Sequence, residues 1–138
     1  MWVYDQPTGQ IFHDEKAVGT GYSGKGEGKD NPAMESVHNV GPIPKGRYTI
    51  GPPHNTLTHG PYVLPLTPDP DNLMHRRSGF LIHGDSRKAP GTASEGCIIL
   101  ARAIREGIWQ SGDHRLEVTD FFGRRSTLQP GVGLSSEK

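Results

Sequence analysis

Glycine and proline interrupt this chain so often that short strands joined by turns are the expected architecture. The sequence contains 19 glycines and 12 prolines among 138 residues, a high share for a helical protein but below the share typical of disorder throughout. Glycine accepts positive φ angles and proline fixes φ, so both residues favour turns. The chain is therefore predicted to be mainly β and to form a single domain, because its length suits one hydrophobic core.

Short apolar segments mark the expected elements. A β-hairpin is predicted over residues 2–14, with its turn at "DQPTG". Residues 23–42 carry almost no periodic apolar signal, which indicates a long loop, and its length and glycines suggest a lid over a site. The remaining predictions are strands at 16–22, 47–50, 60–68, 79–84, 97–100 and 114–122, and one short helix over 101–112.

Two of these predictions, the strand at 60–68 and the helix over 101–112, depend on particular side chains. Pro65 cannot donate to a ladder, so its strand is expected towards a sheet edge. Leu100, Ile104 and Ile108 recur every four residues, as on the core-facing side of a helix. The folded domain is predicted to cover residues 1–120, whereas residues 121–138 have the composition of a loose tail.

Charge balance and the cysteine count exclude several classes of protein. Lys+Arg and Asp+Glu are equal at 15 each, so nothing favours a nucleic acid or an anionic membrane as the partner. No apolar run reaches the roughly 18–20 residues that a membrane span needs, and the first residues lack the features of a signal peptide. One cysteine, Cys97, can form no internal disulfide. The chain is expected to be made in the cytoplasm without a signal peptide.

The glycine-rich and histidine patterns do not support a cofactor. "GTGYSG" has the glycine spacing of a dinucleotide-binding turn, but the string "KGEGKDNP" that follows is hostile to the helix that such a turn must open. A phosphate loop would need Ser or Thr where Gly26 stands. His83 lies one residue from Asp85, yet the histidines form no recognisable zinc-binding frame. We expect neither a nucleotide nor a metal.

Cys97 and His83 are the candidates for chemistry. On its own, a cysteine before an apolar run fits a small buried hydrophobe as well as a nucleophile. Gly96 precedes Cys97 in "SEGC", which places the thiol at the mouth of a turn and lets a carbonyl approach the backbone. A neighbouring imidazole is the usual way to generate a thiolate near neutral pH. The residues between His83 and Ser94 can loop back if the flanking strands are neighbours, so the pair is predicted to meet.

Two further features would complete such a site. Backbone N–H groups of Gly96 and Cys97 are expected to point at a developing oxyanion. The second ring nitrogen of His83 needs a partner, and either the Asp85 carboxylate or a backbone carbonyl would serve. An untethered imidazole would present the wrong nitrogen part of the time.

The segments "IHGD" and "SEGCI" resemble the active-site signature of the L,D-transpeptidases of bacterial cell-wall metabolism, the YkuD-like family. "GPIPKGRYTIG" is similar to an upstream strand of that family and occurs in the right order. The resemblance implies a single-domain β-sandwich or barrel with one short helix after the catalytic cysteine, and no cofactor. It makes Cys97 the nucleophile and His83 its general base. Ser94 and Gly96 would shape the turn, with Asp85 as the remaining candidate catalytic residue.

Three departures from that signature narrow the resemblance. Glu95 stands where the family has a histidine, Ile99 stands where an arginine is often found, and the loop before Ser94 is short. In all three features the sequence resembles the type VI secretion L,D-transpeptidase effectors more than the housekeeping enzymes. Without the arginine, the substrate carboxylate needs another cation. The candidate substrate-binding residues are Tyr22, Arg76, Arg87 and Arg102, with Arg77 and Lys88 as further basic side chains.

The resemblance also implies a reaction and a setting. Tetrapeptide stems of peptidoglycan would be cut between meso-diaminopimelate and D-alanine through a Cys97 thioester, which water, a D-amino acid or a second stem then resolves. The protein would be an antibacterial toxin, delivered by type VI secretion components into the periplasm of a competing bacterium and matched by a cognate immunity protein. Two alternatives remain open. One is a non-catalytic module of a phage tail or a cell-wall-binding protein; the other is a zinc-dependent cell-wall peptidase that uses His83, Asp85 and another histidine.

Overall fold

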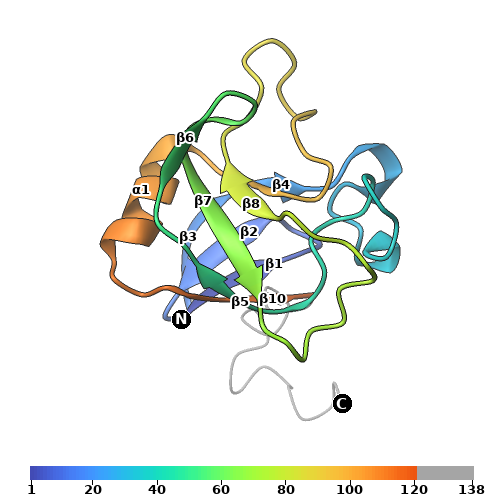
Figure 1. The fold of residues 1–138 in the computed structure, drawn as a ribbon, viewed down its shortest axis with the longest axis horizontal. Helices are drawn as coiled ribbons and strands as arrows, with labels where there is room; N and C mark the ends of the chain where they lie inside the picture. The colour runs from blue at the N-terminus through green and yellow to red at the C-terminus, as the bar shows by residue number, and fades with distance from the viewer. Residues whose placement is uncertain (121–138) are drawn as a thin grey trace, which may run out of the picture.

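Short strands dominate the chain, as the glycine and proline content predicts (Figure 1). The computed structural model describes residues 1–120, so the predicted tail at 121–138 lies outside the described residues. The mainly β fold with one short α-helix after Cys97 is confirmed for this part of the chain. The strands are β1 (Trp2–Asp5), β2 (Gln10–His13), β3 (Lys16–Thr20), β4 (Tyr22–Ser23), β5 (Gly46–Ile50), β6 (His54–Thr56), β7 (Gly60–Pro68), β8 (Leu81–His83), β9 (Ile98–Ile99) and β10 (Arg115–Thr119). The helices are the 3-10 turns η1 (Gly26–Gly28) and η2 (Pro32–Met34) and the α-helix α1 (Arg102–Gln110).

The strands form one mixed sheet whose two edges are adjacent in the chain. The sheet order is β3-β2-β1-β10-β5-β7-β8-β9-β4, and β6 pairs with β7 beside this path. Only Gly21 separates the edge strands β3 and β4, so the sheet has to curl until its edges approach each other. β1 with β10 and β8 with β9 are parallel pairs, whereas the hairpin partners are antiparallel. This arrangement fits the expected β-sandwich or barrel.

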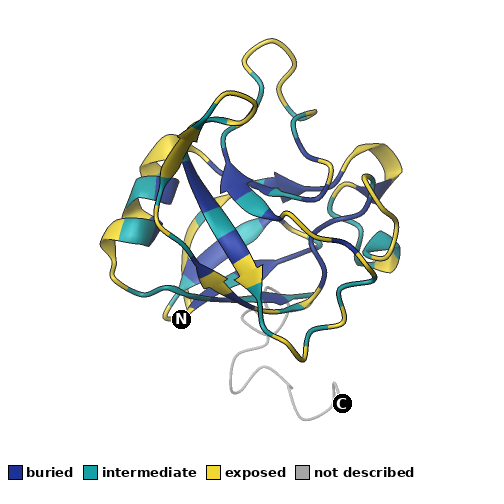
Figure 2. Ribbon diagram, viewed as in Figure 1, coloured by how far each residue is buried: buried dark blue, intermediate teal, exposed yellow. Residues whose placement is uncertain are grey.

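Alternate residues of the strands face inward and build the core (Figure 2). In β10, Leu116 and Val118 are buried while their neighbours are partly exposed, as the two-residue period of a strand requires. Tyr4, Tyr48 and Ile82 are among the largest fully buried side chains. A fully buried aliphatic side chain such as Ile82 contributes about 1.5–3 kcal/mol by leaving water. The core therefore joins strands from both ends and from the middle of the chain.

Helix α1 packs its predicted apolar stripe against this core. Ile108 is fully buried, Ile104 packs against the core cluster, and Leu100 is buried just before the helix begins. On the solvent side, Arg102 pairs with Glu106 at 2.9 Å, an exposed contact that adds only a few tenths of a kcal/mol. Within residues 1–120, no helix has the length and apolar character to cross a membrane.

Pro65 lies inside the sheet, which corrects the expectation of an edge strand. β7 pairs with β8 on one side and with β5 and β6 on the other. The Pro65 carbonyl accepts from the Gly51 N–H at 2.8 Å, and the N–H and C=O of one strand residue point to the same side. The missing N–H of Pro65 therefore faces Gly51, just beyond the end of β5, so the pair keeps one of the two bonds that opposite residues normally exchange.

The long loop at residues 23–42 is packed against the fold. Its two ends are joined by hydrogen bonds such as that from the Lys25 N–H to the Val40 carbonyl at 2.8 Å. His38 and Asn39 are the residues of this loop that line the pocket described below. The loop therefore supplies part of a wall, and its role as a lid stays a prediction.

Candidate active site

The register of β8 and β9 brings His83 and Cys97 to one face of the sheet. The strands are parallel neighbours, with Ile82 opposite Ile98 and His83 opposite Ile99. Ile82 and Ile98 are fully buried in the core, so the residues flanking them along each strand point to the other face. Cys97 precedes Ile98 and His83 follows Ile82, which makes them diagonal neighbours across the pair.

A pocket of about 1120 Å³ opens over this face, and both His83 and Cys97 line it. Asp85 and Glu95 are its acidic side chains. The basic side chains of its wall are Arg76, Arg77, Arg87, Arg102 and Arg105. Since the arginines outnumber the carboxylates, the pocket favours an anionic ligand.

His83 is held as a neutral imidazole with one nitrogen free. Its Nδ1 lies 2.9 Å from the Gly84 carbonyl. Because a carbonyl only accepts, Nδ1 carries the ring proton and Nε2 keeps a lone pair. The side chain is only 3% exposed, and this burial is the main reason why the pKa of His83 lies below its ordinary value. Of the two partners that the sequence allowed for the second nitrogen, the structure has the backbone carbonyl.

Asp85 organises the loop after His83 and does not hold its imidazole. The carboxylate accepts from the Tyr22 hydroxyl at 2.6 Å and from the N–H groups of Ser86 and Gly91 at 2.8 and 3.1 Å. Burial opposes ionisation, but these hydrogen bonds outweigh it and lower the pKa of Asp85. Asp85 therefore acts on His83 through its charge alone.

The Cys97 thiol is partly buried beside the start of β8. Its Sγ lies 4.0 Å from the Gly79 carbonyl. Burial raises the pKa of the thiol, and the opposing influences of the Leu81 N–H and the Arg77 charge reduce this rise without cancelling it. Cys97 and His83 are therefore both uncharged at neutral pH in the resting site.

Ser94 and Gly96 fix the turn that presents Cys97. The Ser94 hydroxyl donates to the Cys97 carbonyl at 2.6 Å. The same oxygen accepts from the N–H groups of Gly96 and Gly24 at 3.0 and 2.9 Å. Gly96 has a φ of +140°, and a Cβ there would lie 2.5 Å from Nη2 of Arg77, so the turn requires glycine. Because Ser94 takes the Gly96 N–H, that group is not available to an oxyanion, which corrects the expectation.

The four predicted substrate-binding residues divide into two groups. Arg76, Arg87 and Arg102 are exposed and line the pocket. Tyr22 is buried and is absent from the pocket lining. Its hydroxyl donates to Asp85 and accepts a backbone N–H at 2.8 Å, so both of its roles are used inside the fold. Tyr22 thus supports the loop after His83, which corrects its assignment to substrate.

Two buried arginines of the pocket wall, Arg77 and Arg105, are anchored to backbone carbonyls. Arg77 reaches four of them at 2.6–3.1 Å, those of Glu35, Gly41, Pro42 and Glu95. Arg105 reaches three at 2.5–3.2 Å, those of Pro61, Tyr62 and Leu100. Neither guanidinium forms an ion pair with a carboxylate among residues 1–120. Their positive charges are met by carbonyl dipoles and by the more distant carboxylates of Glu35 and Glu106.

Sequence reasoning missed two residues of the site, Arg105 and His59. Arg105 lies on α1, and His59 lies in the turn between β6 and β7. Both line the pocket with His83. Neither belongs to a local motif, so the sequence offers no signal that would have identified them.

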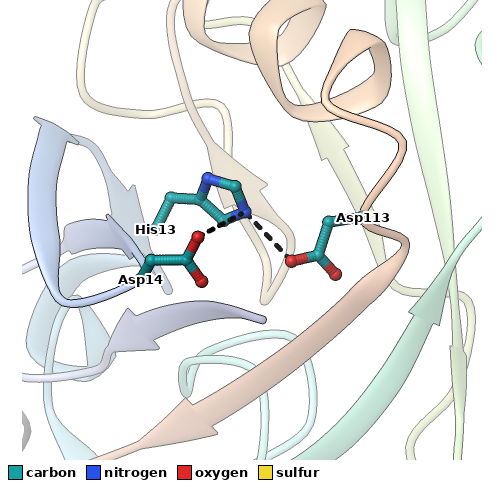
Figure 3. A group of neighbouring side chains, drawn as sticks. All are labelled: His13, Asp14 and Asp113. Carbon is teal, nitrogen blue, oxygen red and sulfur yellow. Dashed lines mark hydrogen bonds and ion pairs between the residues drawn. The ribbon is translucent and has the colours of Figure 1, made fainter.

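Among the described residues, His13, Asp14 and Asp113 form the one close group of possible metal ligands (Figure 3). Nε2 of His13 lies 3.0 Å from an Asp113 carboxylate oxygen and 4.0 Å from one of Asp14. None of the three lines the pocket. His83 and Asp85, which the zinc alternative requires, belong to no such group within residues 1–120.

The fold and pocket define a small β-rich domain with a cysteine and a histidine in a site suited to an anionic ligand. A family model described as the Tlde1 domain matches residues 17–121. Since the match spans more than half of the sequence, the chain belongs to the Tlde1 domain family, whose members are type VI secretion effectors that target peptidoglycan. The family implies an immunity protein as a partner. Comparison with curated proteins gave no significant match. The YkuD-like relationship stays a prediction.

Proposed function

We propose that this chain is a cysteine-dependent L,D-carboxypeptidase of peptidoglycan that also exchanges the terminal D-alanine of tetrapeptide stems. The observation that carries the proposal is that His83, at the end of β8, and Cys97, directly before β9, are diagonal neighbours in one basic pocket. The resemblance of the two flanking segments to L,D-transpeptidases is the basis for assigning the bond that is cut. Membership of the Tlde1 domain family is the basis for assigning peptidoglycan as the polymer that is attacked.

The first half-reaction moves the acyl group of the stem from D-alanine to sulfur. Sγ of Cys97 attacks the carbonyl carbon of meso-diaminopimelate while the thiol proton passes to Nε2 of His83. When the tetrahedral intermediate collapses, the C–N bond to D-alanine breaks and the proton on His83 goes to the leaving amine. A tripeptide thioester then remains on Cys97, and His83 is neutral again.

The neutral resting pair suits this order of events. Because burial disfavours both the thiolate and the imidazolium, His83 acts as a general base during attack and not as the cation of a preformed ion pair. The charge of Arg77 and the N–H of Leu81, which both favour the thiolate, stabilise the sulfur as it becomes anionic.

The second half-reaction resolves the thioester. Attack by water, with His83 taking a proton, gives the tripeptide, and attack by the amine of a D-amino acid gives an exchanged stem. An amine from a second stem would give a crosslink. For a toxin, hydrolysis and exchange are the damaging outcomes, since both remove the donor stems on which crosslinking depends.

The exposed arginines of the pocket supply a carboxylate site. Arg76 and Arg87 are exposed in its wall, so their guanidinium groups are free to turn towards a ligand. We assign the D-alanine carboxylate to this pair, which takes the place of the arginine absent at Ile99. Arg77 and Arg105 also line the pocket but are bound to backbone carbonyls, so they contribute their charge without turning towards a ligand.

The same proposal includes the biological setting. The chain is delivered by type VI secretion components and acts in the periplasm of a competing bacterium, where peptidoglycan is accessible. The producing cell protects itself with a cognate immunity protein. Family membership supports this setting.

Tetrapeptide muropeptides and purified protein test the reaction. The wild-type protein should release D-alanine and leave tripeptide, and with excess D-methionine it should form a stem that ends in D-methionine. Cys97→Ala and His83→Gln should lose both products. His54→Ala, which changes an exposed histidine outside the pocket lining, should retain them. Equal turnover by Cys97→Ala would remove the thiol from the mechanism.

Two further measurements separate the alternatives. Co-sedimentation with insoluble peptidoglycan, without any release of D-alanine, would favour a non-catalytic binding module. Loss of D-alanine release in EDTA, with recovery on addition of Zn²⁺, would favour the zinc-dependent peptidase. The proposal expects release that EDTA does not affect and a thiol reagent abolishes.

A further inference from the structure

A second histidine ring covers the imidazole of His83. His59 lies in the turn between β6 and β7, and its ring centroid is 4.7 Å from that of His83, with 51° between the planes. His59 is exposed, whereas His83 is only 3% exposed. Both side chains line the pocket. His59 therefore separates part of the buried imidazole from solvent.

The hairpin that carries His59 is fixed by its own hydroxyl groups. The His59 N–H donates to Oγ1 of Thr56 at 2.8 Å, and the same hydroxyl donates to the Gly60 carbonyl at 3.3 Å. Oγ1 of Thr58 lies 3.0 Å from Nδ1 of His59, a contact that orients the ring. Because β7 pairs with β6 on one side and with β8 on the other, the turn is held beside the strand that carries His83.

Four charged or titratable groups face His83 from the elements around it. His59 on the hairpin and Arg105 on α1 both disfavour a positive charge on the imidazole. Asp85, in the loop that follows β8, favours that charge. Cys97 is the diagonal neighbour before β9 and is uncharged at rest. Burial has the largest influence of all, and it lowers the pKa of His83.

We propose that His59 is a positioning residue for the catalytic base: its ring covers the imidazole of His83, excludes water from it, and keeps it uncharged with Nε2 available to the Cys97 thiol. This inference rests on the proposed function, because only a base that takes a proton needs to be neutral. His59 makes no bond to the substrate in this account. The role requires a flat ring at this position and not the proton chemistry of an imidazole.

Two substitutions of His59 test the proposal, because they differ in whether a ring remains. His59→Ala removes the cover, so water reaches His83 and its pKa should rise towards the ordinary value. His59→Phe keeps a flat ring, so the low pKa should persist. His54→Ala is the matched control, since it removes an exposed histidine from the same hairpin but outside the pocket lining.

The first readout is the titration of His83 followed by nuclear magnetic resonance, with His83→Gln identifying its ring signal. The midpoint should rise in His59→Ala and stay at the wild-type position in His59→Phe and His54→Ala. This measurement needs no turnover, so it decides the proposal even where the reaction assigned above fails. An unchanged midpoint in His59→Ala would overturn the proposal, and so would an equal rise in the alanine and phenylalanine variants.

The second readout is the pH dependence of D-alanine release. Protonation of His83 removes the base, so activity should fall on the acid side, and in His59→Ala the fall should begin at a higher pH. The ratio of the rate at about pH 7.5 to the rate at about pH 5.5 should therefore increase severalfold in His59→Ala and stay at the wild-type value in His59→Phe. A uniform loss of rate at every pH would indicate a merely structural role and contradict the proposal.

Discussion

Burial leaves Cys97 and His83, the proposed nucleophile and base, uncharged at rest. It raises the pKa of the thiol and lowers that of the imidazole, because both charged forms lose their solvation. Opposite shifts of an acid and a base leave the pair neutral across neutral pH. In the proposed reaction the thiolate therefore forms only as its proton moves to His83, during attack on the substrate carbonyl.

Alkylation of Cys97 tests this neutral state. At about pH 7, iodoacetamide should modify the folded protein more slowly than a free thiol of ordinary pKa, and the rate should rise only above the ordinary pKa of cysteine, because burial raises the pKa of Cys97. Protein unfolded in urea, whose thiol is in water, provides the reference. Rapid modification of the folded protein below about pH 6 would indicate a preformed thiolate and contradict the account.

Single residues also show what the sequence reveals about the site. His83 and Cys97 fall in short segments whose neighbours are informative, so both could be predicted. His59 reaches the pocket only because a hairpin packs beside β8, and no spacing in the sequence reports that contact. Asp85 is close to His83 in sequence, which suggested it as a partner of the imidazole. Its carboxylate instead accepts hydrogen bonds from the Tyr22 hydroxyl and from the N–H of Ser86 in its own loop.

One buried arginine joins the long loop at residues 23–42 to the turn before Cys97. Arg77 donates to three carbonyls that follow η2, and to the Glu95 carbonyl in that turn. Its planar guanidinium satisfies all four at once, which the ammonium of a lysine, with three donors, cannot do. The loop and the turn are therefore parts of one hydrogen-bonded unit.

Truncation of Arg77 should destabilise the protein far more than truncation of its neighbour. Arg77→Ala leaves four carbonyls without their donor and should lower the free energy of unfolding by about 3 kcal/mol or more. Arg76→Ala removes an exposed side chain from the adjacent position and should change it by less than about 0.5 kcal/mol. Urea unfolding measures the free energy of unfolding of both variants. Similar losses in the two would contradict the structural role assigned to the four hydrogen bonds of Arg77.

Strands were predictable where apolar side chains mark them, as in β8 and β10. β6 has the sequence "HNT" and pairs with β7 through its backbone, so its side chains carry no strand signal. Pro65 was placed towards an edge because a proline lacks a donor. The sequence could not show that β7 has partners on both sides and that Pro65 still pairs with Gly51 through its carbonyl.

The curl of the sheet holds the site together from distant parts of the chain. β4 directly follows β3 in the chain, but it pairs with β9 at the opposite edge of the sheet. The Ser23 hydroxyl donates to the Gly96 carbonyl at 2.8 Å and accepts from the Ile43 N–H at 2.9 Å. Three separate segments thus meet at the turn before Cys97. The site therefore depends on the complete fold and not on its local motif.

The dependence of global stability on pH should carry a contribution from His83. The pKa of His83 is lower in the folded state than in the unfolded state. Above about pH 6.5 the imidazole is neutral in both states, so it makes no pH-dependent contribution to the free energy of unfolding. As the pH falls below that value, the unfolded state takes up the proton first and stability declines. The urea midpoint should therefore fall between about pH 6.5 and pH 5, and His83→Gln should flatten that fall. An identical decline in His83→Gln would contradict the assigned burial.

Trapping of the acyl group by hydroxylamine tests the central claim most directly. Hydroxylamine attacks thioesters readily, so a reaction with tetrapeptide stems in its presence should yield tripeptide hydroxamate at the expense of tripeptide, with D-alanine released as before. Cys97→Ala should form neither hydroxamate nor D-alanine. Release of D-alanine at an undiminished rate by Cys97→Ala, or by the wild-type protein without any hydroxamate, would contradict a thioester on Cys97.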